Sequence, residues 1–190
     1  MKSTPSKIVT ALVALCAAAV VSVAAEPTPL AVGQPAPAFQ IRDSAGKAID
    51  LAALTEKGPV LVRLTCGCLG CNKELPYFQE LHAAYKDKGL TSLAIFREPD
   101  DKVEAYVKEK KLDMLYAVDA KGESWKVFQT KTMPSNFLIE KGGKLAAIST
   151  GCDPSGLIAT RLSEKAAVLV DAEKVDVRTK VKSAVTAPAK

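Results

Sequence analysis

The hydrophobic and polar positions along the chain predict short strands that alternate with helices. Three apolar runs, 60–65, 90–96 and 115–118, predict buried strands, and only Arg63 interrupts the first of them. Apolar residues recur at helical spacing from Leu75 to Tyr85, which predicts a helix directly after the first strand. Further helices are expected over 100–110, where acidic residues begin the segment, over 123–128 and over 154–170.

Two pairs of short apolar segments predict hairpins near the two ends of this region. Segments 38–41 and 48–51 flank a polar turn, and segments 136–140 and 144–149 flank a turn that contains Gly142 and Gly143. Strands that alternate with helices and end in a hairpin predict an α/β fold in which helices cover both faces of a mixed sheet.

The N-terminus has the pattern of an export signal. Lys2 and Lys7 precede an apolar run, 8–25, that ends in small residues, so we expect residues 1–25 to form a signal peptide. An uncleaved membrane anchor is the alternative, because the run is about as long as the shortest membrane-spanning helix. Cys16 follows a bulky leucine, which favours an ordinary cysteine of the leader over a lipidation site.

The remaining chain divides into a linker, one domain and a tail. Segment 26–37 contains four prolines and predicts an extended linker, 38–170 is the expected domain, and the polar, basic segment 171–190 is expected to be disordered. Loss of the two leader lysines lowers the formal charge from +5 to +3, too small an excess to suggest a nucleic-acid partner. Export would place the domain in the periplasm or another extracytoplasmic compartment, where disulfides persist.

The cysteines outside the leader point to redox chemistry. Cys66, Cys68 and Cys71 lie within six residues and Cys152 lies far away, which favours a reactive cluster over a disulfide framework. Cys68 and Cys71 form a CxxC motif between a buried strand and a helix. The free N–H groups and the dipole of a helix N-terminus stabilise a thiolate. We therefore expect Cys68 to be the nucleophile and Cys71 the resolving thiol.

This motif and two further segments resemble the TlpA/ResA-like branch of the thioredoxin superfamily, among the redoxin or AhpC-TSA proteins. The segments are 32–39, before the first hairpin, and 132–139, and the likeness extends over about 32–162. It implies a thioredoxin-like three-layer α/β/α sandwich with an N-terminal β-hairpin extension. It also implies an exported thiol:disulfide oxidoreductase without a cofactor, with protein disulfide or dithiol clients and a membrane thiol reductase as candidate electron donor.

The resemblance also implies roles for individual residues. Pro134 matches the cis-proline of the family, and Glu74 matches an acid that transfers protons near the redox pair; the alternative for Glu74 is a solvated helix glutamate paired with Lys73 or a neighbour. On this fold Cys152 follows a strand that returns to the active-site end. Cys152 is therefore expected to be a nearby free thiol or an auxiliary redox partner. Cys66, two residues before Cys68, is expected to be an auxiliary redox residue that could replace the resolving thiol. The chain departs from the family at Gly67, where an aromatic residue is usual.

Two other functions compete for the same residues. The four cysteines could bind zinc, or fewer of them copper, but a second CxxC pair is missing and the only histidine, His82, lies on the predicted helix. We therefore predict no metal site. A thiol peroxidase is suggested by Thr65, three residues before Cys68, and by Arg97, but leucine stands where the peroxidase motif has proline, four residues before the threonine.

Overall fold

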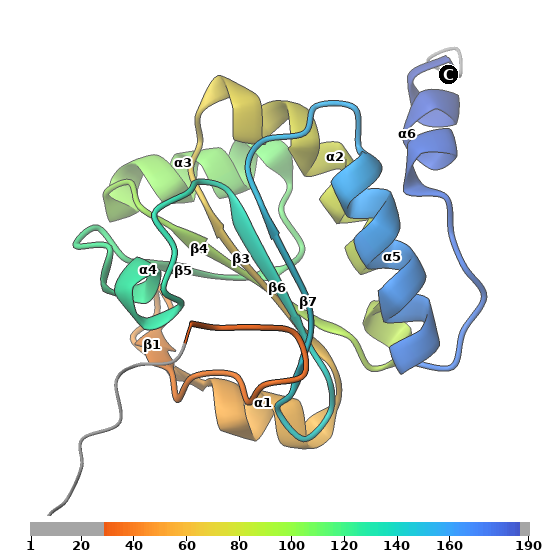
Figure 1. Ribbon diagram of the computed structural model, residues 1–190. Coiled ribbons are helices and arrows are strands. Elements are labelled where there is room, and N and C mark those ends of the chain that lie inside the picture. Colours follow the sequence, from red (N-terminus) through yellow and green to blue (C-terminus); the bar gives the residue numbers. More distant parts are fainter. Residues whose placement is uncertain (1–28, 187–190) are drawn as a thin grey trace, which may run out of the picture.

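The fold is built on a five-stranded mixed sheet, shown in Figure 1. A computed structural model describes residues 29–186 of the 190. The strands lie in the order β5-β4-β3-β6-β7, with β4 parallel to β3 and β5, and β6 antiparallel to β3 and β7. This arrangement confirms the predicted α/β class and mixed sheet. The strands are β3 (Val60–Thr65), β4 (Thr91–Phe96), β5 (Leu115–Val118), β6 (Ser135–Ile139) and β7 (Leu145–Thr150).

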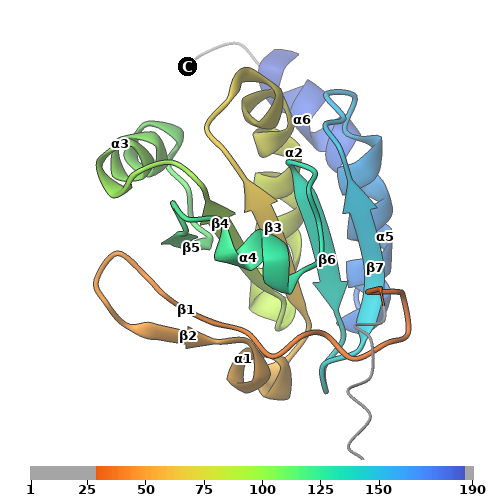
Figure 2. The ribbon, with the colours of Figure 1, turned by 60° about the vertical axis from the view of Figure 1, so that its left-hand side comes forward.

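Helices and a small hairpin cover the two faces of this sheet and complete the three expected layers (Figures 1 and 2). One face packs against α2 (Leu69–Tyr85), α3 (Asp100–Lys110) and α5 (Leu157–Leu169), and α6 (Val177–Thr186) packs on the outside of α2 and α5. The other face packs against the hairpin of β1 (Gln40–Arg42) and β2 (Ala48–Asp50), against α1 (Leu51–Lys57) and against α4 (Glu123–Val127). The turn η1 (Lys86–Lys88) ends α2.

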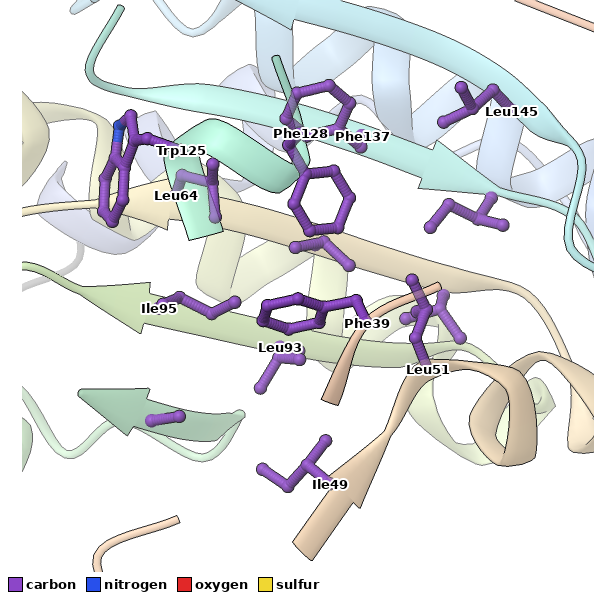
Figure 3. Close-up of a cluster of buried hydrophobic side chains, with 14 residues drawn as sticks. Phe39, Ile49, Leu51, Leu64, Leu93, Ile95, Trp125, Phe128, Phe137 and Leu145 are labelled. Carbon is purple, nitrogen blue, oxygen red and sulfur yellow. The ribbon is translucent and has the colours of Figure 1, made fainter. Parts of the chain in front are cut away.

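The alternation of side chains along β3 explains both layers of the core. Val62 and Leu64 point to the hairpin side, where they join a cluster that includes Phe39 and Phe128 (Figure 3). Leu61 belongs to the opposite cluster, with the apolar side chains of α2 and α5. Arg63 follows the period of Leu61 and therefore lies on the α2 side, buried at 3% exposure.

The prediction of a disordered tail is wrong over the last helix. Residues 177–186 form α6, and the side chain of Val177 is fully buried. The Tyr85 hydroxyl accepts a 3.0 Å hydrogen bond from the Val175 N–H, which fixes the segment that leads into the helix. Apolar residues in this otherwise polar segment cover the apolar surface of α2 and α5, and that burial orders the segment.

Part of the predicted linker also belongs to the domain. The Gly33 N–H donates to the Leu145 carbonyl at 2.7 Å, the Ala36 N–H donates to the Gly143 carbonyl at 2.7 Å, and the Leu145 N–H donates to the Gln34 carbonyl at 2.9 Å. These bonds attach residues 33–36 to the β6–β7 hairpin, because the free edge of β7 offers unpaired backbone groups.

Helix α1 was not predicted from the hydrophobic pattern. Its N-cap is Asp50, whose carboxylate accepts hydrogen bonds from the N–H groups of Ala52 and Ala53. The helix spans seven residues, too few for the apolar spacing to show a helical period.

The predicted leader, 1–25, lies outside the described residues. Within 29–186, no helix is both long and apolar enough to cross a membrane.

Candidate active site

Three cysteine thiols meet where β3 ends and α2 begins. Cys66 follows β3 and is 8% exposed, Cys68 is the exposed N-cap of α2, and Cys71 lies in its first turn at 2% exposure. The three sulfur atoms lie within 4.8 Å of one another, and the Cys66 and Cys71 sulfurs are 3.4 Å apart. The cluster therefore presents one thiol to solvent and keeps two beneath it.

The surroundings separate the pKa values of these thiols. Partial burial acts to raise the pKa of Cys68, but hydrogen bonds from the Cys66 thiol and from the backbone N–H and thiol of Cys71 outweigh it, so the pKa of Cys68 is lowered. Burial raises the pKa of Cys66 strongly, and its hydrogen bond to Cys68 adds to the shift. Cys68 is therefore the thiol that the structure favours as the thiolate.

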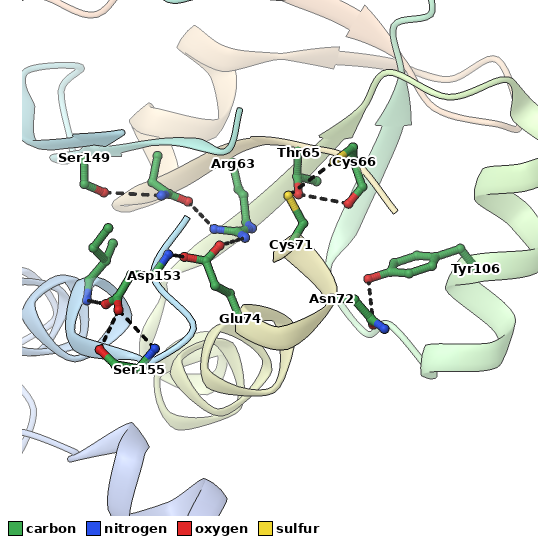
Figure 4. Close-up of polar contacts among 12 residues, drawn as sticks. Arg63, Thr65, Cys66, Cys71, Asn72, Glu74, Tyr106, Ser149, Asp153 and Ser155 are labelled. Carbon is green, nitrogen blue, oxygen red and sulfur yellow. Dashed lines mark hydrogen bonds and ion pairs between the residues drawn. The ribbon is translucent and has the colours of Figure 1, made fainter. Parts of the chain in front are cut away.

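A buried ion pair lies behind the cysteines (Figure 4). The Arg63 guanidinium donates to Glu74 Oε2 at 2.7 Å, and the two side chains are 4% and 1% exposed. The other carboxylate oxygen of Glu74 accepts a hydrogen bond from the Asp153 N–H. The interpretation of Glu74 as a solvated glutamate is wrong, because its side chain is buried and pairs with Arg63. Its role in proton transfer stays a prediction.

The ion pair continues into a network across four elements. Arg63 also donates to Asn136 Oδ1 at 2.8 Å, and Asn136 donates to Ser149 Oγ at 3.3 Å. The guanidinium lies over the Phe78 ring, 3.9 Å from its centroid. This network joins β3, α2, β6 and β7, so it fixes the start of α2 against the sheet.

Cys152 lies at the same end of the sheet, as the topology predicted. A Cβ atom placed on Gly70 would lie 2.9 Å from Cys152 Sγ, so the absence of a side chain inside the CxxC motif makes room for this thiol. Burial raises the pKa of Cys152, and the charge of Glu74 adds to the shift. The auxiliary redox role of Cys152 stays a prediction.

Replacing Gly70 with alanine is expected to displace the Cys152 thiol and to change its alkylation rate about two- to fivefold, because the new methyl group takes its place at the motif. Stability should change by less than about 1 kcal/mol, since the displaced atom ends an exposed side chain. The rate is measured by mass spectrometry of the peptide that contains Cys152. Leu69→Ala is the matched control; equal Cys152 rates in both variants and the wild type would contradict the prediction.

The cis-proline predicted from the family resemblance is confirmed. The Met133–Pro134 peptide bond is cis, and Pro134 is buried at the start of β6. Its carbonyl accepts a 2.9 Å hydrogen bond from the Gly151 N–H, which ties this loop to the segment that carries Cys152. The part of Pro134 in catalysis stays a prediction.

A cavity of about 280 Å³ opens beside Cys68. Its wall includes Glu98, from the loop after β4, and Tyr106, from α3, neither of which was predicted from the sequence. Glu98 Oε1 accepts a 2.7 Å hydrogen bond from the Gly67 N–H, whereas its buried Oε2 has no partner among the described residues. The sequence did contain a signal for the place of Glu98. Glu98 comes shortly after β4, which runs parallel to β3, and neighbouring parallel strands end at the same edge of a sheet.

His82 and Arg97, which were weighed for other functions, do not line the cavity beside Cys68. His82 is buried at 8% exposure, and burial lowers its pKa. It lies eleven residues after Cys71, about 16 Å along α2. Arg97 lies near the Trp125 ring, 5.7 Å from its centroid, and is absent from the lining of the cavity beside Cys68.

Comparisons with known proteins agree with this geometry. The model of the AhpC/TSA family matches residues 32–148. The thiol-disulfide oxidoreductase ResA of Bacillus thuringiensis subsp. konkukian is 37% identical over 115 residues, which are 60% of this chain and 66% of that protein. ResA of Geobacillus thermodenitrificans is 32% identical over 127 residues, 66% of this chain and 73% of that protein. The chain thus spans 66% of the length of the Bacillus relative.

Solved structures show the same fold. A structure from Chlorobium tepidum superposes with a TM-score of 0.67 at 23% identity. The match covers 74% of this chain and 99% of the Chlorobium chain. The thioredoxin domain of a thiol-disulfide oxidoreductase from Bacteroides vulgatus has a TM-score of 0.60 at 25% identity, with 70% and 98% covered. The family match over more than half of the chain, together with these relatives, shows that the chain belongs to the AhpC/TSA family, as a TlpA/ResA-like redoxin.

Proposed function

We propose that this protein is a thiol:disulfide oxidoreductase that exchanges disulfides with protein clients through Cys68 and Cys71. One observation carries the proposal: an exposed cysteine at a helix N-terminus, with a lowered pKa, lies within 4.8 Å of a cysteine that is 2% exposed. Such a pair combines a reactive thiolate with a shielded thiol that can resolve its product.

The reaction proceeds in two exchanges. The Cys68 thiolate attacks one sulfur of a client disulfide, the client S–S bond breaks, and the other client sulfur leaves as a thiolate. Cys71, once deprotonated, then attacks Cys68 Sγ, which releases the second client sulfur and leaves a Cys68–Cys71 disulfide. Two electrons pass to the client, and the reverse sequence oxidises a client dithiol.

The surface around Cys68 suits an extended client segment. Leu69, inside the motif, is 70% exposed, and the neighbouring cavity has an apolar wall that includes Phe96 and Val103. A client side chain can enter this cavity while its disulfide approaches Cys68.

Export and the supply of electrons complete the proposal. The leader, 1–25, delivers the domain to the periplasm or another extracytoplasmic compartment, and a membrane thiol reductase returns Cys68 and Cys71 to the reduced state. The reduction potential of this couple sets the net direction: a strongly reducing value makes the protein a reductase, and a high value makes it an oxidase.

The proposal is tested by trapping the intermediate. The double variant Cys66→Ser, Cys71→Ser is expected to accumulate a mixed disulfide between Cys68 and a client, because attack still occurs but neither neighbouring thiol can resolve it. Insulin serves as the client, and non-reducing electrophoresis with mass spectrometry identifies the adduct. Cys66 must be removed too, since its sulfur lies in the same 4.8 Å cluster.

A triple variant that adds Cys68→Ser is the control and should form no adduct at this cluster. Wild-type insulin reduction by the double variant would contradict the proposal, because turnover would then proceed without Cys71.

Thiolate metal binding is the second candidate function, and the sulfur cluster itself favours it. Three thiolates within 4.8 Å of one another suit a soft ion such as Cu(I), whereas structural zinc sites use four ligands. Stoichiometric metal in the purified protein, combined with an absence of disulfide exchange, would favour this function over the first.

A further inference from the structure

The strongest feature that the proposed mechanism does not use is the contact between Cys66 and Cys71. Their sulfurs are 3.4 Å apart, close to van der Waals contact, although the mechanism needs only Cys68 and Cys71. Cys71 lies in one cluster with the exposed thiol of Cys68 and the buried thiol of Cys66. A sulfur with two thiol neighbours can form a disulfide with either.

We infer that Cys71 forms two alternative disulfides, and that oxidation first captured by Cys68 and Cys71 moves inward to a buried Cys66–Cys71 bond. The inference rests on the proposed function, because the Cys68–Cys71 disulfide is its starting point. It gives Cys66 a redox role at the same site. The oxidised protein then has two forms, one with the exposed Cys68–Cys71 disulfide and one with the buried Cys66–Cys71 disulfide.

The transfer is an internal thiol–disulfide exchange that needs no further oxidant. The Cys66 thiol gives its proton to solvent, and the thiolate attacks Cys71 Sγ. A Cys66–Cys71 bond forms, the Cys71–Cys68 bond breaks, and the electron pair leaves on Cys68 Sγ. One disulfide and one thiol are present before and after the step, so the oxidation state of the protein is unchanged.

The surroundings of the two outer thiols set the direction of this exchange. Exchange proceeds toward release of the thiol with the lower pKa, because that sulfur is the better leaving group. Cys68 is exposed and receives hydrogen bonds from the N–H groups of Cys71 and Gly70, which stay in place when Cys66 and Cys71 form a disulfide, whereas burial raises the pKa of Cys66. The Cys66–Cys71 bond with a free Cys68 thiolate is therefore the favoured oxidised form.

Burial gives the two forms different access to solvent. Cys66 and Cys71 are 8% and 2% exposed, so a bond between them is shielded from external thiols. The exposed Cys68 returns to the thiol state and again faces the cavity beside it. Reduction then requires the reverse exchange. The Cys68 thiolate attacks Cys71 Sγ and restores the Cys68–Cys71 disulfide, which an external thiol can reach.

The test locates the disulfide in the full-length wild-type protein. The reduced protein is oxidised with one equivalent of oxidised glutathione, quenched in acid after increasing times and alkylated with a light reagent. It is then reduced and alkylated with a heavy reagent. Trypsin releases 64–73 as one peptide that contains all three cysteines, and Cys152 lies on another. Fragment spectra therefore assign a label to each sulfur.

At equilibrium we expect light label on Cys68 and heavy label on Cys66 and Cys71, with roughly tenfold or more excess over molecules that carry light label on Cys66. Early quenching should show the reverse assignment, with Cys66 light. The matched control is Cys66→Ser, which should keep Cys68 heavy at every time and lose the rapidly alkylated thiol of the oxidised wild type.

The outcomes separate this inference from the proposed function. If Cys68 and Cys71 become heavy and Cys66 stays light at all times, the exchange is refuted while the oxidoreductase assignment stands. If Cys152 and one of the three cluster cysteines carry the heavy label instead, these two formed the disulfide, and the exchange is also refuted. If no cysteine is oxidised, both the assignment and the exchange fail.

Discussion

Replacing Cys68 with serine is expected to reduce the rate of insulin reduction at least about a hundredfold, because a hydroxyl cannot attack a disulfide and the other two thiols of the cluster are buried. In the wild type, Cys68 should be the first cysteine of the cluster to be alkylated. Its alkylation rate should rise with pH and level off below the ordinary cysteine pKa, since its own pKa is lowered. Turnover assays and timed alkylation with peptide mass spectrometry measure both.

The matched control is Glu56→Gln, an exposed change on α1 at the opposite end of β3, which should keep wild-type turnover. Turnover in Cys68→Ser within a factor of two of the wild type would refute the assignment of the nucleophile. Faster alkylation of Cys66 than of Cys68 at neutral pH would contradict the order of their pKa values.

Removing one partner of the buried ion pair is expected to lower the free energy of unfolding by about 3–5 kcal/mol. Arg63→Met leaves the Glu74 carboxylate buried without its cation, and Glu74→Leu leaves the guanidinium without its anion. The double variant should lose clearly less than the sum of the two single losses, because neither charge then remains. Urea unfolding of the reduced proteins, followed by circular dichroism, measures these differences.

Lys126→Ala provides the control. It breaks the pair of Lys126 with Glu123, whose side chains are 72% and 61% exposed, and should change stability by less than about 0.5 kcal/mol. Losses below about 1 kcal/mol in both Arg63→Met and Glu74→Leu would show that solvent compensates the remaining charge, and that the network does not hold α2 to the sheet.

Local patterns in the sequence were sufficient for most of the elements and for the position of the CxxC motif between a strand and a helix. The apolar run 60–65 and the charged segment 100–110 match β3 and α3 to the residue, because both have clear breaks at their ends. The position of Cys68 and Cys71 at a helix N-terminus could be predicted, because the strand, the motif and the start of the helix follow one another directly along the chain. These predictions depend only on neighbours along the chain.

Contacts between distant segments were decided by the tertiary structure. The pattern around Arg63 marked it as unusual but contained no information about its partners, Glu74 and Asn136, which different elements bring to it. The place of Cys152 against Gly70 and the cavity wall at Glu98 depend on the order of strands and on how loops end beside one another. The sequence by itself determined which thiols could react. Packing decided which of them is exposed, which are buried and which two touch, because burial and contact are properties of the whole fold.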